Sequence, residues 1–129
     1  MNGSYLIDTN IIIKLFANSP EIIEKLKEYS GVLIPVTVIG ELYYGAYNSV
    51  QIEHNEGIID SLADKFEIIN IDRNTAKVYG QIKAKLKKQG TPIPENDIWI
   101  AAAALQFSLP VLTNDKHFSK IDGLEVINL

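Results

Sequence analysis

Hydrophobic and polar positions follow two patterns that alternate along the chain. Short apolar runs, typical of buried strands, occur at residues 5–7, 31–35, 67–71, 110–113 and 124–127. Longer stretches with apolar residues three or four positions apart predict helices at 20–29, 37–47, 50–65, 73–89 and 95–107. A further helix opens after residue 8, and residues 114–118 form a short turn or helix. Strands that alternate with helices predict an α/β domain with a mostly parallel sheet.

Several boundary residues support these elements. Asp72 can cap the helix that follows it, and Gly90 is suited to end that helix. Pro92 and Pro94 then favour an extended, non-helical backbone before the next helix begins. Neither an internal repeat, a low-complexity tract nor a long linker divides the 129 residues. We therefore predict a single domain over residues 1–129.

The composition excludes several kinds of site. The chain has no cysteine, which rules out disulfide scaffolds, zinc–thiolate sites and cysteine nucleophiles. His54 and His117 are the two histidines, too few for a histidine-rich metal site. No secretory signal is visible, because Asp8 precedes the first basic residue, Lys14. The longest run without charge, residues 98–114, is interrupted by polar residues and a proline, so we expect no membrane span and a soluble cytoplasmic protein.

Charge is distributed unevenly along the chain. The net charge of −4 argues against a general nucleic-acid binder, which usually carries a basic surplus. Residues 73–94, however, contain no acid and hold half of the 12 basic residues: Arg73, Lys77, Lys83, Lys85, Lys87 and Lys88. A solvated helix face is the simplest interpretation of this basic segment.

Two acids stand where predicted strands end. Asp8 ends the first strand, and Asp115 comes just after the strand near residue 112. Ligands of open parallel sheets bind outside the carboxyl ends of the strands, so these two acids could share one crevice. The alternatives are a helix cap for Asp8 and a turn residue for Asp115.

Two further acids stand on predicted helices. Glu41 lies at the edge of the apolar stripe of its helix, where a carboxylate can reach a crevice at the rim of the core. A partly exposed surface glutamate is the alternative. Asp97 begins a helix whose body, residues 98–105, is apolar all round, and no basic residue near it in sequence offers a partner. The alternative for Asp97 is a favourable interaction with the helix dipole.

Convergence of these four acids would require a cation or protons. Two carboxylates about 5 Å apart repel by roughly 3 kcal/mol at an effective dielectric constant of about 20. Ligands that are all oxygen atoms suit Mg²⁺ or Mn²⁺, and such an ion can activate water and stabilise charge on a phosphate. The prediction of a metal site therefore depends on a fold that brings the four acids together.

Four segments of the sequence carry a resemblance to a known family. They are Leu6–Asn10, Gly40–Ala46, Pro94–Ala102 and Leu112–Phe118. Each is moderately specific, whereas all four in this order and at these distances are highly specific. The chain resembles PIN-domain ribonucleases over essentially its whole length, and among them the VapC-type toxins of bacterial and archaeal toxin–antitoxin pairs.

The resemblance implies a PIN-like three-layer α/β/α sandwich with a central, mostly parallel five-stranded sheet. It implies that Asp8, Glu41, Asp97 and Asp115 are the catalytic residues and hold one or two Mg²⁺ or Mn²⁺ ions for endonucleolytic cleavage of RNA. By this resemblance Asp8 and Asp97 are direct ligands, whereas Glu41 and Asp115 act through a second ion, through water or by orienting the ligands. Hydrogen bonds to the ligands are expected from Thr9, Asn10 and Thr113.

The resemblance also implies partners. The substrate is transfer, ribosomal or messenger RNA, the toxin is a homodimer, and a VapB-type antitoxin inhibits it. Lys83, Lys85, Lys87 and Lys88 of the basic segment could supply the field that a phosphodiester substrate needs near an acidic site. Tyr43, Tyr44 and Tyr47 are candidates for contact with a partner or for core packing.

Other interpretations remain open at this stage. One is a catalytically silent PIN domain that acts as a protein or RNA interaction module. Another is a receiver-like phospho-acceptor domain, which would use Asp72 as its acceptor, although a helix cap explains Asp72 as well. We do not favour His117 as a general base, because Phe118 beside it is typical of a packing anchor.

Overall fold

A five-stranded parallel sheet forms the centre of the computed structural model, which describes residues 3–129. The strands are β1 (Tyr5–Ile7), β2 (Val32–Pro35), β3 (Glu67–Ile69), β4 (Val111–Thr113) and β5 (Val126–Asn128). Their order across the sheet is β3-β2-β1-β4-β5, and every neighbouring pair is parallel. The predicted five-stranded sheet is thereby confirmed.

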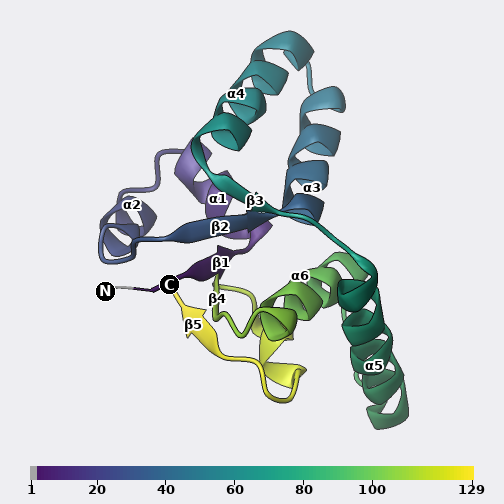
Figure 1. Ribbon diagram of the computed structural model, residues 1–129. Coiled ribbons are helices and arrows are strands. Elements are labelled where there is room, and N and C mark those ends of the chain that lie inside the picture. The colour runs from purple at the N-terminus through teal and green to yellow at the C-terminus, as the bar shows by residue number, and fades with distance from the viewer. Residues whose placement is uncertain (1–2) are drawn as a thin grey trace.

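Helices cover both faces of this sheet. They are α1 (Thr9–Phe16), α2 (Pro20–Leu26), α3 (Val36–Tyr47), α4 (Ile52–Lys65), α5 (Arg73–Gln89) and α6 (Glu95–Gln106), with the short 3-10 helix η1 (Lys116–Lys120) after β4. In Figure 1 the helices α1, α3 and α4 rise on one side of the sheet, whereas α5 and α6 lie together on the other side. Parallel strands are joined by right-handed crossovers, so a reversal of strand order moves the connecting helices to the opposite face. The predicted three-layer α/β/α fold is confirmed.

The point where strand order reverses lies between β1 and β4. From β1 the chain proceeds to β2 and β3 on one side, and then returns through α5 and α6 to place β4 on the other side of β1. The connections that follow β1 and β4 therefore diverge at the carboxyl ends of these two strands, which is where open parallel sheets place a ligand crevice. Asp8 and Asp115 follow these strands directly.

Several boundaries differ from the sequence prediction by two or three residues. The strand predicted at 67–71 ends at Ile69, and its last partner is Pro35 on β2. Helix α3 begins at Val36, so β2 offers no backbone for a longer β3 to pair with. The helix predicted at 20–29 ends at Leu26. The remaining predicted helices and strands agree with the observed ones to within a few residues.

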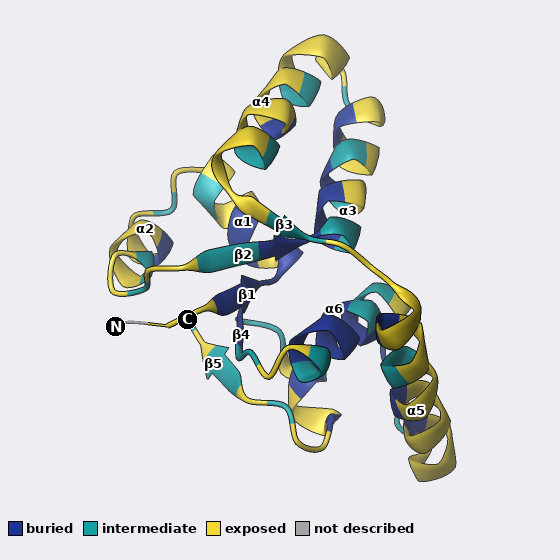
Figure 2. Cartoon of the chain, in the orientation of Figure 1, coloured by how far each residue is buried: buried dark blue, intermediate teal, exposed yellow. Residues whose placement is uncertain are grey.

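The core is concentrated on β1, β4 and α6, as Figure 2 shows in dark blue. The four alanines 101–104 of α6 are almost completely buried, as are Ile98 and Ile100. Trp99 is half-buried and stacks on Tyr79 of α5, with ring centroids 3.9 Å apart. Within residues 98–105, whose apolar character on all sides indicates burial, only Trp99 and Leu105 are partly exposed. Within residues 3–129, none of the helices has the length and hydrophobicity that crossing a bilayer requires.

Helix α5 is held to α6 at its first turn. The backbone N–H of Thr75 donates to Asp72 Oδ1 (3.0 Å), and the backbone N–H of Asp72 donates to Thr75 Oγ1 (3.1 Å), which completes a capping box. Gln106 of α6 donates to the same Asp72 oxygen (3.0 Å). Gly90 ends the helix with φ of 69°, a left-handed conformation that glycine adopts without strain. The capping role predicted for Asp72 is confirmed.

This cap generates a prediction about stability. Thr75→Val removes a buried hydroxyl that bonds Asp72 and Gln106, and we expect the free energy of unfolding to fall by about 1–2 kcal/mol. Thr91→Val is the matched control, because its buried hydroxyl has no hydrogen-bond partner among the described residues. Urea denaturation followed by circular dichroism measures both variants. Equal stability of the two variants would contradict the proposed contribution of the cap.

Candidate active site

Asp8 lies at the end of β1 and is 2% exposed. Its backbone N–H donates to the carbonyl of Leu112 (3.0 Å), so pairing with β4 continues up to this residue. Thr113 Oγ1 donates to Asp8 Oδ2 (2.8 Å). Asp8 occupies the N-cap position of α1 without a side-chain capping bond, so the helix-cap alternative does not explain its carboxylate.

Asp97 lies in the first turn of α6 and is 8% exposed. The partner that sequence reasoning did not find is His117, whose ring Nδ1 lies 2.9 Å from Asp97 Oδ2. The two residues are 20 positions apart, and no spacing rule connects the start of α6 with η1. The fold alone therefore brings this histidine into the site.

Asp115 precedes η1 and combines two roles. Its Oδ1 accepts the backbone N–H of His117 (2.9 Å), which is the turn role considered from the sequence. The same oxygen also lies 2.9 Å from His117 Nδ1. The backbone N–H of Asp115 donates to Thr113 Oγ1 (2.9 Å), so a single threonine contacts both Asp8 and Asp115. The turn conformation thus places Asp115 in the crevice.

Glu41 approaches from α3 and is half-buried. Thr9 Oγ1 donates to Glu41 Oε1 (2.7 Å), which ties α3 to the start of α1. Glu41 also lines a shallow hollow with Thr37, Tyr44 and Asn96, where Asn96 is the neighbour of Asp97. Glu41 is thus partly exposed, and its charge acts on Asp97.

Of the three residues expected to support the ligands, two make the expected bonds. Thr113 contacts Asp8, and Thr9 contacts Glu41. Asn10 is exposed, and its side chain forms no hydrogen bond with the rest of the described chain. The side chain of Phe118 is fully buried, so its predicted role as a packing anchor is confirmed.

Burial and mutual repulsion raise the pKa values of the deepest acids. Burial, together with the charges of Asp97 and Asp115, raises the pKa of Asp8 to about 6, against the hydrogen bond from Thr113. Burial also raises the pKa of Asp97, the contact with His117 opposes it, and the charges of Asp115 and Glu41 add to the increase. All four acids therefore interact electrostatically in one cluster.

The cluster fits a divalent cation. Ligand atoms of Asp97, Asp115 and His117 lie within 4.8 Å of one another, and Asp8 and Glu41 border the same group. Among residues 3–129, neither lysine nor arginine forms an ion pair with any of the four acids. Uncompensated carboxylate oxygens are the donors that Mg²⁺ and Mn²⁺ accept. Residues that could hold a cation therefore gather here, and His117 stands among them in addition to the predicted acids.

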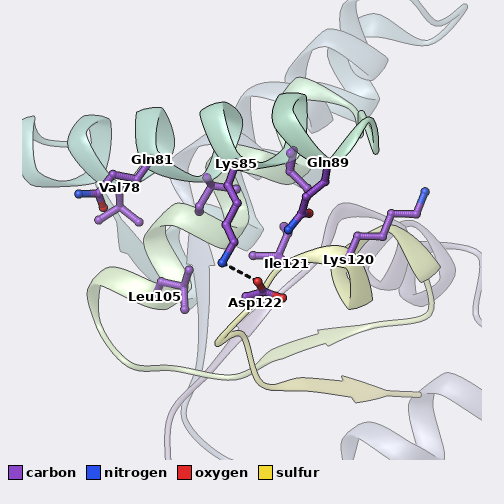
Figure 3. Close-up of a pocket in the computed structure, with 10 residues that line it drawn as sticks. Val78, Gln81, Lys85, Gln89, Leu105, Lys120, Ile121 and Asp122 are labelled. Carbon is purple, nitrogen blue, oxygen red and sulfur yellow. Dashed lines mark ion pairs between the residues drawn. The ribbon is translucent and has the colours of Figure 1, made fainter.

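Only part of the basic segment, residues 73–94, is free of ion pairs with acids. Lys83 pairs with Glu95, the first residue of α6, and Lys85 pairs with Asp122 after η1 (2.5 Å). The Lys85 pair bridges a cavity of about 180 Å³ between α5 and residues 120–122, shown in Figure 3. None of the four acids lines this cavity. Lys87 and Lys88 stay exposed at the end of α5, without an ion pair among the described residues.

Comparison with known proteins identifies the family. The sequence model of the PIN domain family matches residues 5–124, so the chain belongs to the PIN domain family. It is 35% identical to ribonuclease VapC2 of Haemophilus influenzae over an alignment of 127 residues, and this alignment covers 96% of each chain. It is 32% identical over 125 residues, 95% of each chain, to the tRNA(fMet)-specific endonuclease VapC of Salmonella typhimurium.

A solved structure supports the same assignment. A chain of the DNA-bound VapBC complex from Salmonella typhimurium superposes with a TM-score of 0.88 at 30% identity, over 97% of both chains. The resemblance to VapC-type PIN domains inferred from the sequence is thereby confirmed. The receiver-like alternative is wrong, because the chain is a PIN domain and Asp72 serves as a helix cap.

The raised pKa of Asp8 predicts how stability depends on pH without metal. Between about pH 4 and 6 the folded protein keeps a proton that the unfolded chain has lost, so stability falls as pH rises through this window. A shift of about 2 pKa units corresponds to about 3 kcal/mol. Asp8→Asn should remove this cost and be more stable than the wild type above pH 6. Urea denaturation in EDTA from pH 4 to 8 measures the difference.

Asp72→Asn is the control, because stability that depends on Asp72 should change with pH in the opposite direction. Hydrogen bonds from Thr75 and Gln106 lower the pKa of Asp72, so its stabilising effect is present at neutral pH and is lost on acidification. If the Asp8→Asn and wild-type stability curves run parallel from pH 4 to 8, Asp8 does not hold the proton assigned to it.

Proposed function

We propose that this protein is a metal-dependent endoribonuclease and the toxin component of a toxin–antitoxin pair. It hydrolyses RNA phosphodiester bonds at the cluster of Asp8, Glu41, Asp97 and Asp115, and residues 1–129 act as one PIN domain. The observation that carries the proposal is the convergence of these acids, without a basic partner among the described residues, at the β1/β4 switch point. The ribonuclease names of full-length relatives support it.

Each acid has a proposed role. Asp8 and Asp97, the two most buried acids, hold Mg²⁺ or Mn²⁺ directly. Glu41 and Asp115 are more exposed, and they orient the first ligands or take part through a second ion or water. Thr113 holds Asp8 and the backbone of Asp115 in register, and Thr9 fixes Glu41. Such supporting bonds keep ligands in a productive orientation before the substrate arrives.

The reaction is an in-line hydrolysis. When bound, a divalent cation activates water and neutralises charge on the phosphate. The water oxygen forms a bond to phosphorus while the bond from phosphorus to one sugar oxygen breaks, and that oxygen leaves with a proton. A carboxylate of the cluster accepts the proton that the water gives up, and a proton returned from the cluster or from solvent completes the leaving hydroxyl.

The substrate is transfer, ribosomal or messenger RNA. Transfer RNA is the first to test, because relatives from Salmonella typhimurium and Shigella flexneri are named tRNA(fMet)-specific endonucleases. The approach of RNA is assisted by Lys87 and Lys88, which project from the end of α5 that leads to the start of α6. Since RNA is the substrate, we propose that the protein acts in the cytoplasm.

A VapB-type antitoxin is the proposed inhibitor, and a homodimer is the proposed assembly. Solved relatives from three bacteria are described as VapBC complexes. Tyr44 is 72% exposed beside Glu41, so it is available to a partner at the rim of the site. Tyr43, in contrast, donates to Asp60 (2.5 Å) and stacks on Tyr47, which indicates a structural role in joining α3 and α4.

The alternative function is a catalytically silent PIN domain that binds protein or RNA. The complete acidic cluster argues against it. Four interacting carboxylates destabilise the fold unless they serve chemistry or a cation, and a pure interaction module has no need of them.

Cleavage of RNA tests the proposal. Replacement of the partners of metal ligands typically costs 10–100-fold in activity, so we expect Asp97→Asn, which alters a proposed ligand, to lose more than about 100-fold. The assay incubates total cellular RNA and purified transfer RNA with Mg²⁺ or Mn²⁺ and sequences the ends. Asp72→Asn is the control, since this acid also follows a strand but lies outside the cluster.

We expect the wild type to cut RNA at discrete positions. EDTA and the Asp97→Asn substitution should abolish these cuts, whereas the Asp72→Asn variant should still make them. Cuts that persist in EDTA would contradict the metal requirement. If the folded wild type binds RNA but cuts none of it with either ion, the silent interaction module replaces the enzyme.

The basic segment generates a separate prediction about binding. Replacing both Lys87 and Lys88 with glutamine should weaken RNA binding and reduce the slope of log Kd against log salt by roughly 1.4, at about 0.7 per lost phosphate contact. Filter binding with a catalytically inactive Asp97→Asn background measures it. The charge-matched control replaces Lys25 and Lys27, which pair with Glu21 and Glu24 on α2. An unchanged slope would remove Lys87 and Lys88 from the RNA-binding surface.

A further inference from the structure

His117 occupies a position in the acidic cluster that the proposed function has not used. Its ring Nδ1 lies 2.9 Å from Asp97 Oδ2 and 2.9 Å from Asp115 Oδ1. A ring nitrogen carries at most one hydrogen, so a single N–H faces two carboxylate oxygens. A cation between these atoms would satisfy all three at once.

The distances also match the edges of an octahedron. Two ligands at right angles around an ion, each about 2.1 Å from it, lie about 3.0 Å apart. Both separations between Nδ1 and a carboxylate oxygen are close to this value. The three ligand atoms lie within 4.8 Å of one another, which allows all of them to contact one ion.

The position of His117 is fixed by its surroundings. Its backbone N–H donates to Asp115 Oδ1 (2.9 Å), and the next residue, Phe118, is fully buried. These contacts fix the backbone of His117 beside the cluster, and the two carboxylates hold its ring there. The side chain is 40% exposed, which leaves part of the ring in contact with water.

We propose that His117 Nδ1 is a metal ligand, in the position between Asp97 and Asp115, and that it biases this position toward Mn²⁺ over Mg²⁺. This inference rests on the proposed metal-dependent function and names a residue outside the acidic quartet. Imidazole nitrogen suits first-row transition metals, whereas carboxylate and water oxygens serve Mg²⁺ and Mn²⁺ alike. A mixed nitrogen and oxygen donor set thus raises affinity for Mn²⁺ specifically.

The competing interpretation makes His117 a positioning residue. In that case Nδ1–H holds the two carboxylates by hydrogen bonds, and the ion contacts oxygen atoms alone. The two interpretations predict different magnetic surroundings for a bound Mn²⁺, because only a directly coordinated histidine nitrogen couples strongly to the unpaired electrons.

Pulsed electron paramagnetic resonance of the Mn²⁺-loaded full-length chain separates them. The chain contains two histidines, and His54 is exposed on α4. We expect a nitrogen coupling that changes from ¹⁴N to ¹⁵N when histidine alone is labelled. The coupling should persist in His54→Asn and disappear in His117→Asn. If His117→Asn fails to fold, His54→Asn still decides the question, because His117 is then its only histidine.

Calorimetric titration provides the second readout. His117→Asn should raise the Kd for Mn²⁺ by roughly tenfold while changing the Kd for Mg²⁺ by less than about threefold. His54→Asn should change neither value.

The failures are distinguishable. Mn²⁺ that binds and supports cleavage without a histidine coupling overturns the ligand role of His117 and leaves the nuclease intact. A folded wild type that binds neither ion, and cuts no RNA with either, overturns both the proposed function and this inference.

Discussion

Burial of uncompensated carboxylates at the β1/β4 junction is the constraint on which the rest of this structure depends. Asp8 and Asp97 are almost inaccessible to water, and each feels the charge of other acids rather than of a lysine or arginine. Such an arrangement costs folding free energy, which polar contacts from Thr113, Thr9 and His117 reduce without removing. The cost is understandable only if the cluster has a chemical purpose, and membership of the PIN domain family supplies one.

The topology explains how the acids meet. Reversal of strand order between β1 and β4 opens a crevice, and the adjoining strand ends deliver Asp8 and Asp115 to it. Asp97 needs a helix that begins at this crevice and runs through the interior. The run of alanines makes α6 narrow enough to be enclosed by the sheet, α3 and α5. The capping box at Thr75 and the Tyr79–Trp99 stack then fix α5 against α6.

Much of this could be predicted from the sequence, for identifiable reasons. Apolar runs and helical periodicity located the strands and helices, and strand ends pointed to Asp8 and Asp115. The sequence did not predict that β3 ends at Ile69, because this end depends on its partner strand β2 ending at Pro35. Glu41 and Asp97 stood out locally, but periodicity carries no information on convergence, and the family resemblance had to supply it. The proximity of His117 to Asp97 had only an indirect signal, namely its place two residues after Asp115, since the contact joins η1 to a helix start 20 residues earlier.

The same charges that build the site oppose its substrate. An RNA phosphate that approaches four carboxylates is repelled, and the net charge of −4 adds to the repulsion. The basic segment compensates less than its composition indicates, because Lys83 and Lys85 are already paired with Glu95 and Asp122. Lys87 and Lys88 alone cannot reverse the field within the crevice, since exposed charges are screened over a Debye length of about 8–10 Å. In the proposed reaction, favourable binding of the scissile phosphate would require a cation among the carboxylates, so we expect metal and RNA to bind with positive coupling, each strengthening the other.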